Sequence, residues 1–175
     1  MKSRDLSQMF VNYHLPRFGE LPAVGLFLEQ TVKYVNQVLA PLGDEFILTS
    51  TMVSNYVKQK IIPNPQQKTY SRQQIAYLIY ITIIKNVVSL KDITEMFTIQ
   101  KNEYELVVAY DYFCDEFENV LQYVFQNQAT LPFIGGPMTQ SKLLLKNAIM
   151  AIVYQLYLTK YLLALKCWAK LKQVL

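Results

Sequence analysis

Residues 48–97 read LTSTMVSNYVKQKIIPNPQQKTYSRQQIAYLIYITIIKNVVSLKDITEMF, and the rest of the chain is organised around them. Two hydroxyl residues, Thr49 and Ser50, precede a short run of apolar residues at helical spacing. This pattern predicts an N-capped helix over residues 50–59. The prolines in residues 61–65 (IIPNP) end it, because proline lacks an amide hydrogen and disfavours helix in the residue before it.

Two more helices follow at short intervals. Residues 66–70 are too few for more than a tight loop or small hairpin. Ser71 with Gln74 three residues later has the spacing of a capping box, and Ser89 with Asp92 repeats it. Helix, proline-stopped turn, short loop, helix and capped helix is the order of a winged helix-turn-helix.

The spaced features resemble the MerR family of transcriptional regulators. That family's head has a tyrosine-bearing helix, a Gly-Leu-Ile-Pro-x-Pro exit, a wing closed by tyrosine, a Ser/Thr-capped helix and a Ser-Leu-x-x-Ile turn. The corresponding residues are Tyr56, residues 61–65, Tyr70-Ser71 and residues 89–93. The whole chain, including Leu15-Pro16-Arg17 and Glu20-Leu21-Pro22, is also similar to uncharacterised bacterial proteins with a MerR-like head. That second resemblance implies a fold and no established activity.

Several positions depart from the MerR pattern. Lys60 replaces the glycine before the exit, where a positive φ costs another residue roughly 1 kcal/mol. Ser54 and Asn55 replace the usual arginine and first tyrosine, and the wing is short. No first helix is recognisable near residues 46–47. We expect an amphipathic helix over residues 22–40 to pack on the head in its place.

The composition favours an all-α fold. Apolar residues make up 52% of the 175 residues, only five are glycine, and strand-like alternation is scarce. We expect a MerR-like winged helix-turn-helix followed by two long antiparallel helices. Residues 1–98 would hold the N-terminal helix and the head, and residues 99–175 a helical hairpin for dimerisation or effector binding. A break or kink is expected at residues 98–100.

The predicted hairpin consists of helices over residues 101–128 and 139–171. The first has a wide apolar stripe opposite a solvent face of carboxylates, and the second is apolar nearly all round. A membrane span is disfavoured, because Lys146 and Lys160 leave thirteen residues between them, short of the ~20 that a bilayer needs. We therefore expect the second helix to pack within its subunit and against a partner subunit, and no membrane contact.

Charge is distributed unevenly along the chain. Six basic and two acidic residues between 49 and 97 give +4, and no carboxylate occurs between Glu45 and Asp92. Residues 98–138 carry −5 and residues 139–175 carry +6, so the two long helices would complement each other. A basic head suits DNA phosphates, since each neutralised phosphate releases counterions. An ordinary solvated surface is the alternative.

The resulting hypothesis is a homodimeric, sequence-specific regulator bound to double-stranded DNA, with the 50–59 helix in the major groove. The candidates for base edges are Thr51, Ser54 and Asn55. The candidates for phosphate contacts are Tyr56, Lys58, Lys60, Lys68, Tyr70 and Arg72. Core packing is the alternative role for both tyrosines. A speculative effector pocket comprises Tyr110, Phe113, Tyr154, Tyr157 and Trp168, with core packing again the alternative.

Other function classes receive less support. No Ser/His/Asp, Cys/His or Glu-x-x-His set indicates catalysis, so we expect no enzyme, cofactor or metal. Cys114 and Cys167 read as free thiols in a reducing cytosol, and the N-terminus has no signal-peptide pattern. We therefore expect a cytoplasmic protein. The competing hypothesis is a protein-interaction adaptor that keeps the winged-helix shape without binding DNA.

Overall fold

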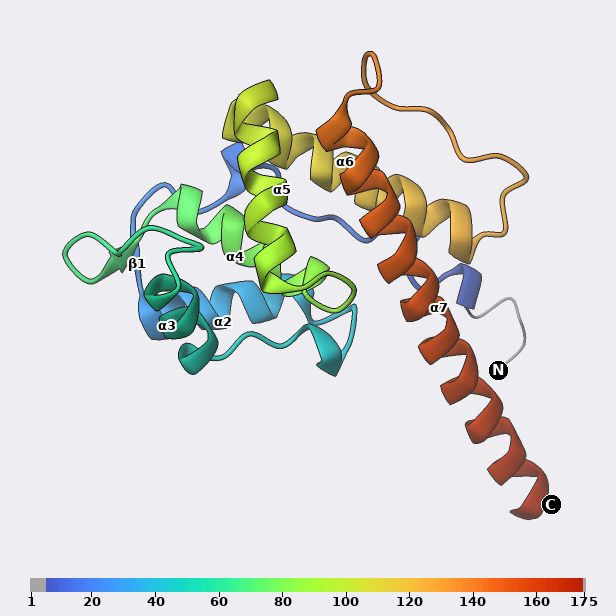
Figure 1. The fold of residues 1–175 in the computed structure, drawn as a ribbon. Helices are drawn as coiled ribbons and strands as arrows, with labels where there is room; N and C mark the ends of the chain where they lie inside the picture. Colours follow the sequence, from blue (N-terminus) through green and yellow to red (C-terminus); the bar gives the residue numbers. More distant parts are fainter. Residues whose placement is uncertain (1–5, 175) are drawn as a thin grey trace.

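The computed structural model describes residues 6–174, apart from the side chains of Trp168 and residues 170–174. Helices dominate it, which confirms the all-α class in outline (Figure 1). The α-helices are α2 (Leu28–Leu39), α3 (Ser50–Lys58), α4 (Arg72–Ile84), α5 (Leu90–Glu103), α6 (Leu106–Phe125) and α7 (Gln140–Val174). The short elements are the 3-10 helices η1 (Phe18–Glu20) and η2 (Asp44–Phe46) and the strands β1 (Leu26–Phe27) and β2 (Thr69–Tyr70).

A two-stranded sheet joins the start of α2 to the start of α4. Strand β1 leads directly into α2 and pairs antiparallel with β2, so that Leu26 lies opposite Tyr70. The strands approach closely at Gly25, where an added Cβ would lie 2.7 Å from Thr69 Oγ1. The helix predicted over residues 22–40 therefore begins only at Leu28, because the residues before it are extended. Helix α2 packs against both α3 and α4, which confirms the packing expected for the helix over residues 22–40.

The loop before β2 is a two-residue hairpin. Gln66 and Thr69 exchange backbone hydrogen bonds of 3.1 and 2.8 Å. Between them, Gln67 and Lys68 have φ values of 48° and 65°. Two successive positive φ angles define a type I′ turn, whose twist matches that of paired strands. Of the two predicted forms, a tight loop or a small hairpin, the structure has the hairpin.

Both predicted caps are present. The Ser71 hydroxyl accepts from the backbone N–H of Gln74, and the side-chain oxygen Oε1 of Gln74 accepts from the backbone N–H of Ser71. The Gln74 side chain also donates to the Pro63 carbonyl at 2.9 Å, which holds the proline exit against α4. At α5, the Ser89 hydroxyl accepts from the backbone N–H of Asp92.

The predicted break at residues 98–100 is wrong. Helix α5 continues to Glu103 and ends where Tyr104 turns extended, with φ −144° and ψ 145°. There the Gln100 side chain donates to the Tyr104 carbonyl at 2.6 Å, while the Tyr104 N–H bonds back to the Gln100 carbonyl. The expected division at residues 98/99 thus falls inside α5. One cluster of buried residues, from Leu6 to Leu156, extends across it.

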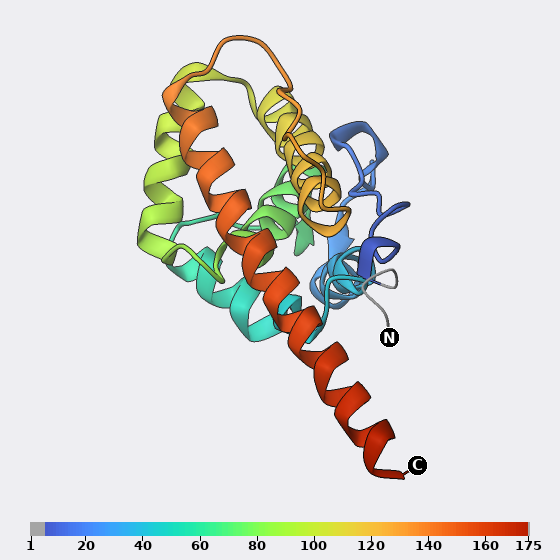
Figure 2. The same cartoon turned by 90° about the vertical axis from the view of Figure 1, so that its right-hand side faces the viewer.

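Helix α7 has two unlike halves. Its N-terminal half packs against α4, α5 and α6 and buries side chains such as Ile149, Val153 and Leu156. Its C-terminal half projects beyond the rest of the molecule (Figures 1 and 2). By length and composition alone, residues Gln140–Cys167 would be sufficient to cross a membrane.

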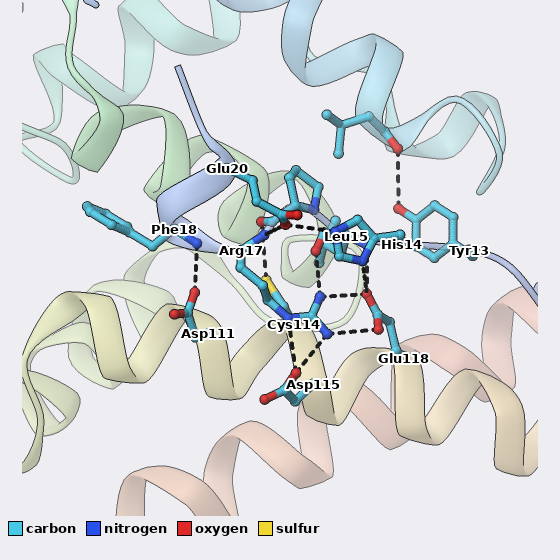
Figure 3. A network of polar contacts seen from close by, with 12 residues as sticks. Tyr13, His14, Leu15, Arg17, Phe18, Glu20, Asp111, Cys114, Asp115 and Glu118 are labelled. Atoms are coloured by element: carbon cyan, nitrogen blue, oxygen red, sulfur yellow. Dashed lines mark hydrogen bonds and ion pairs between the residues drawn. The ribbon is translucent and has the colours of Figure 1, made fainter. Parts of the chain in front are cut away.

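The carboxylates of α6 do not form the solvated face that we expected. Glu118 accepts from the Leu15 N–H at 2.7 Å and from the Arg17 guanidinium, and Asp111 accepts from the Phe18 N–H at 2.6 Å (Figure 3). These acids therefore hold the N-terminal segment. Among the described residues, α6 and α7 share one ion pair, Glu116–Lys146 at 3.7 Å, so charge complementarity between the two helices is slight.

Candidate nucleic-acid interface

Helix α3 has a buried face and a polar, exposed face. Thr49 caps it by accepting from the Met52 N–H. Val53 and Tyr56 point into the core, with 0% and 3% of their surfaces exposed. The opposite face carries the predicted base-contacting residues Thr51, Ser54 and Asn55, followed by Lys58, all exposed.

The side chains of Ser54 and Asn55 form local hydrogen bonds to residues four positions away. The Ser54 hydroxyl donates to the Ser50 backbone carbonyl at 2.9 Å, and the Asn55 side-chain oxygen Oδ1 accepts from the Gln59 side-chain amide at 3.0 Å. No other helix covers these side chains, since both are exposed. Bonds of this local, solvated kind exchange readily for bonds to another molecule.

Three exposed lysines lie at the end of α3 and on the hairpin. Lys58 is the last residue of α3, and Lys60 follows in a left-handed conformation with φ 58°. Lys68 occupies the second position of the hairpin turn. Helix α3 and the hairpin lie at the same end of the molecule (Figure 1). The structure thus leaves Lys58, Lys60 and Lys68 available to an anionic partner.

The other three predicted phosphate contacts are not on this surface. Tyr56 and Tyr70 belong to the core, with 3% and 5% exposure, and burial raises the pKa of both hydroxyls. Arg72 is half-buried, and its guanidinium lies 5.7 Å from the ring centroid of Phe18. Core packing is therefore the role of both tyrosines, and Arg72 contacts the N-terminal segment.

A carboxylate that sequence reasoning missed lies at the start of α3. Glu29, on α2, accepts a hydrogen bond of 2.7 Å from the Ser50 hydroxyl. The helix N-terminus is the end that carries partial positive charge, so Glu29 offsets it. Although residues 46–91 contain no acidic side chain, folding brings one from twenty-one positions upstream. No local sequence signal marks this contact.

Lys85, which follows α4, contacts the segment before α3 and the first turn of α3. Its ammonium donates to the Ile47 carbonyl at 3.3 Å and approaches Met52 Sδ at 3.4 Å. Burial lowers the pKa of this lysine. Lys85 therefore positions the segment before α3, and the basic charge counted in the sequence is not all on the candidate interface.

Of the five residues predicted to form an effector pocket, the four whose side chains the structure describes do not form one site. Tyr110 and Phe113 pack together, with ring centroids 6.1 Å apart, but no ring contact joins them to Tyr154 or Tyr157. Phe113 is fully buried, while Tyr154 lies on α7 with 45% of its surface exposed. Tyr157 stacks on Tyr161, and its ring centroid lies 5.3 Å from that of Phe125. The side chain of Trp168 lies outside the described part of the chain. Of the four described residues, Tyr110 alone lines the cavity found between α4, α5, α6 and α7.

Residues 16–113 match a family described as a domain of unknown function, DUF1836. The chain belongs to this family. No curated protein and no solved structure matches the chain.

The DUF1836 match covers the elements from η1 to α5 and the first part of α6. It begins at the N-terminal segment that α6 holds and includes α2, α3, the hairpin, α4 and α5. It ends inside α6, at Phe113, and so crosses the expected division at residues 98/99. Asp111, which accepts from Phe18, lies within the match, whereas Glu118 and the whole of α7 lie beyond it.

Proposed function

We propose that this DUF1836 protein binds double-stranded DNA through the exposed face of α3, with the 66–69 hairpin as a wing. The observation that carries the proposal is the division of α3 into a core-anchored face and an outer face of hydroxyls, an amide and a lysine. A helix anchored in this way can enter a major groove without unfolding its support. Residues 40–49 link α2 to α3 and are longer than a simple helix-turn-helix turn.

The chemistry of the surface gives the residues two roles. Hydroxyl and amide side chains match the donors and acceptors of base edges, so Thr51, Ser54 and Asn55 would read sequence. Lys58, Lys60 and Lys68 would pair with backbone phosphates that border the groove. Three such contacts predict a slope of about −3 in log affinity against log salt concentration.

An exposed apolar stripe on the middle and C-terminal part of α7 supports a homodimer. Side chains on one stripe of α7 recur at alternating spacings of three and four and are all exposed: Ala151, Tyr154, Leu158, Tyr161 and Leu165. That spacing is the heptad pattern of a two-stranded coiled coil. We call this stripe the α7 seam. Its pairing would cover apolar surface, such as Leu158 at 59% exposure, and would present two copies of α3 to one duplex.

The packing of α7 favours a cytoplasmic dimer over a membrane span. Crossing a bilayer with this helix would remove Ile149, Ile152 and Val153 from the core, where each is at most 1% exposed. It would also break the ion pair between Lys146 and the buried carboxylate of Glu116. Burying three aliphatic side chains stabilises the fold by several kcal/mol, at about 1.5–3 kcal/mol each.

Binding to a random-sequence duplex pool, measured by fluorescence anisotropy at several salt concentrations, tests the proposal. Wild-type protein should bind, with affinity that falls steeply as salt rises. The double variant Lys58→Ala/Lys68→Ala should bind at least tenfold more weakly. Lys91→Ala, an exposed lysine on α5, is the matched control and should bind as wild type. Absence of binding at 50 mM salt would refute the proposal.

The adaptor hypothesis has one observation in its favour. Glu29 places a carboxylate at the start of α3, so this end of the helix is less basic than a regulator's would be. An adaptor predicts no duplex binding at any salt concentration and a protein partner on the same exposed face.

A further inference from the structure

A cavity of about 250 Å³ lies between α4, α5, α6 and the start of α7. Aromatic side chains supply much of its wall: Tyr77, Tyr80, Phe97, Tyr104 and Tyr112. The exposed side chains of Val108 and Leu144 also line it, so solvent reaches it. Concave sites with apolar walls and few polar groups are where proteins bind small molecules.

Lys142, which lines this cavity, has an ammonium group that contacts aromatic rings but forms no ion pair among the described residues. The Lys142 ammonium lies 5.2 Å from the ring centroid of Tyr104 and 5.0 Å from that of Tyr112. It also donates to the Pro137 carbonyl at 3.4 Å. Among residues 6–167, none of the ion pairs includes Lys142. An ammonium between aromatic rings, with no carboxylate within 4 Å, retains a strong preference for an anion.

The carboxylate of Glu103 contacts Ser141, the residue before Lys142, and is already hydrogen-bonded there. Glu103, at the end of α5, accepts from both the hydroxyl and the backbone N–H of Ser141 in the first turn of α7. These hydrogen bonds, led by that of the Ser141 hydroxyl, lower the pKa of Glu103. A second cation, Lys101, lies 5.8 Å from the ring centroid of Tyr77, which also lines the cavity. Two ammonium groups, those of Lys142 and Lys101, therefore lie against the aromatic rings of the cavity, and the carboxylate of Glu103 is hydrogen-bonded to Ser141.

We propose that this cavity binds a small aromatic carboxylate, with its ring among the tyrosines and its carboxylate on Lys142. The aromatic walls suit edge-to-face contacts with a ring. A volume of about 250 Å³ fits an acid with one or two rings, below the size of most drug-sized ligands. Lys142 and Lys101 exclude a cationic ligand. The inference does not depend on DNA binding, since no residue of α3 lines the cavity.

Calorimetric titration of the full chain tests the inference with three probes: 4-phenylbutyrate, indole-3-acetate and the neutral analogue 4-phenylbutanol. At least one of the two acids should bind saturably. Lys142→Met keeps the length of the side chain and removes its charge, so it should weaken binding of the acid at least tenfold and leave the alcohol unchanged. Ala109→Trp should fill the cavity from α6 and abolish binding of all probes.

A second measurement keeps the test decisive if Ala109→Trp does not fold. Met96 lines the cavity, so its methyl group should show intermolecular NOEs to the ring protons of the bound acid in wild-type protein. The inference is overturned if neither acid binds, if Lys142→Met binds the acid as tightly as wild type, or if the NOEs come from methyl groups outside the cavity.

Discussion

The Arg17 guanidinium donates to both carboxylate oxygens of Glu118, at 2.6 and 2.8 Å, across 101 residues of sequence (Figure 3). The same carboxylate accepts from the Leu15 N–H at 2.7 Å. This bidentate pair, with Asp111 on the Phe18 N–H, fastens the N-terminal segment along α6. It joins a residue inside the DUF1836 match to one beyond it, so the remainder of α6 contributes contacts to the first residues of the match.

Glu118→Gln should lower the free energy of unfolding by about 1–3 kcal/mol. The amide keeps the shape but loses the charge-assisted bonds to a part-buried Arg17. Urea denaturation followed by circular dichroism measures the change. Asp115→Asn is the matched control, because that carboxylate is more exposed and its ion pair is worth under about 1 kcal/mol. Equal losses in the two variants would contradict the role given to Glu118.

Glu116 should make the protein less stable as pH rises. Its side chain is 1% exposed, and desolvation raises its pKa in the folded state despite the opposing charge of Lys146. The folded state therefore binds this proton more tightly than the unfolded state, so the stability present below the ordinary glutamate pKa is lost as pH rises through the raised pKa. Glu116→Gln should remove this dependence and be more stable than wild type at pH 7. The free energy of unfolding of wild type and variant should be measured from pH 4 to 7. If the two curves run parallel, Glu116 does not cause the loss of stability.

Lys60→Gly should stabilise the fold. Lys60 has φ 58°, a conformation in which a side chain is strained and glycine is not. The gain should be about 0.5–1 kcal/mol after the greater entropy of unfolded glycine is subtracted. Lys58→Gly, two residues earlier and still helical, should instead lose about 1 kcal/mol. If chemical denaturation shows that both variants change the free energy of unfolding in the same direction, Lys60 does not occupy a strained left-handed conformation.

Glu29→Gln should strengthen DNA binding if α3 enters a groove. Removing the carboxylate from the helix N-terminus improves the interaction with phosphate by about 0.3–1 kcal/mol, or about two- to fivefold in affinity. Anisotropy titrations at low salt measure the change, with Glu95→Gln on α5 as an exposed control. An unchanged affinity would place the duplex away from the start of α3.

Leu158→Glu with Leu165→Glu should convert the dimer to monomer. Both side chains lie on the α7 seam, so charges there would face each other across the proposed coiled coil. Leu163→Glu is the control, because Leu163 is equally apolar and 52% exposed but lies off the seam. In sedimentation velocity at micromolar concentration, wild type and the Leu163→Glu control should be dimers, and the double variant should be a monomer. Monomeric wild type, or chain that sediments as a defined species only in detergent, would exclude the soluble dimer.

Local features were predictable, and distant contacts were not. The caps at Ser71 and Ser89 and the helix from Ser50 could be read directly, because each depends on residues three or four apart. The end of α5 was missed, because it depends on a Gln100 side chain that reaches the Tyr104 carbonyl. Apolar spacing predicted that aromatic residues are buried, but not which of them line a cavity.

The sequence by itself determined the helical class, the prolines that end α3 and the order of elements through α5, since these follow from backbone sterics and nearby hydrogen bonds. Only the tertiary structure decided which charges are free. It paired Glu118 with Arg17, brought Glu29 to Ser50 and left Lys142 between two tyrosines. The physical reason is that the partner of a charge depends on the path of the whole chain, which local spacing does not specify.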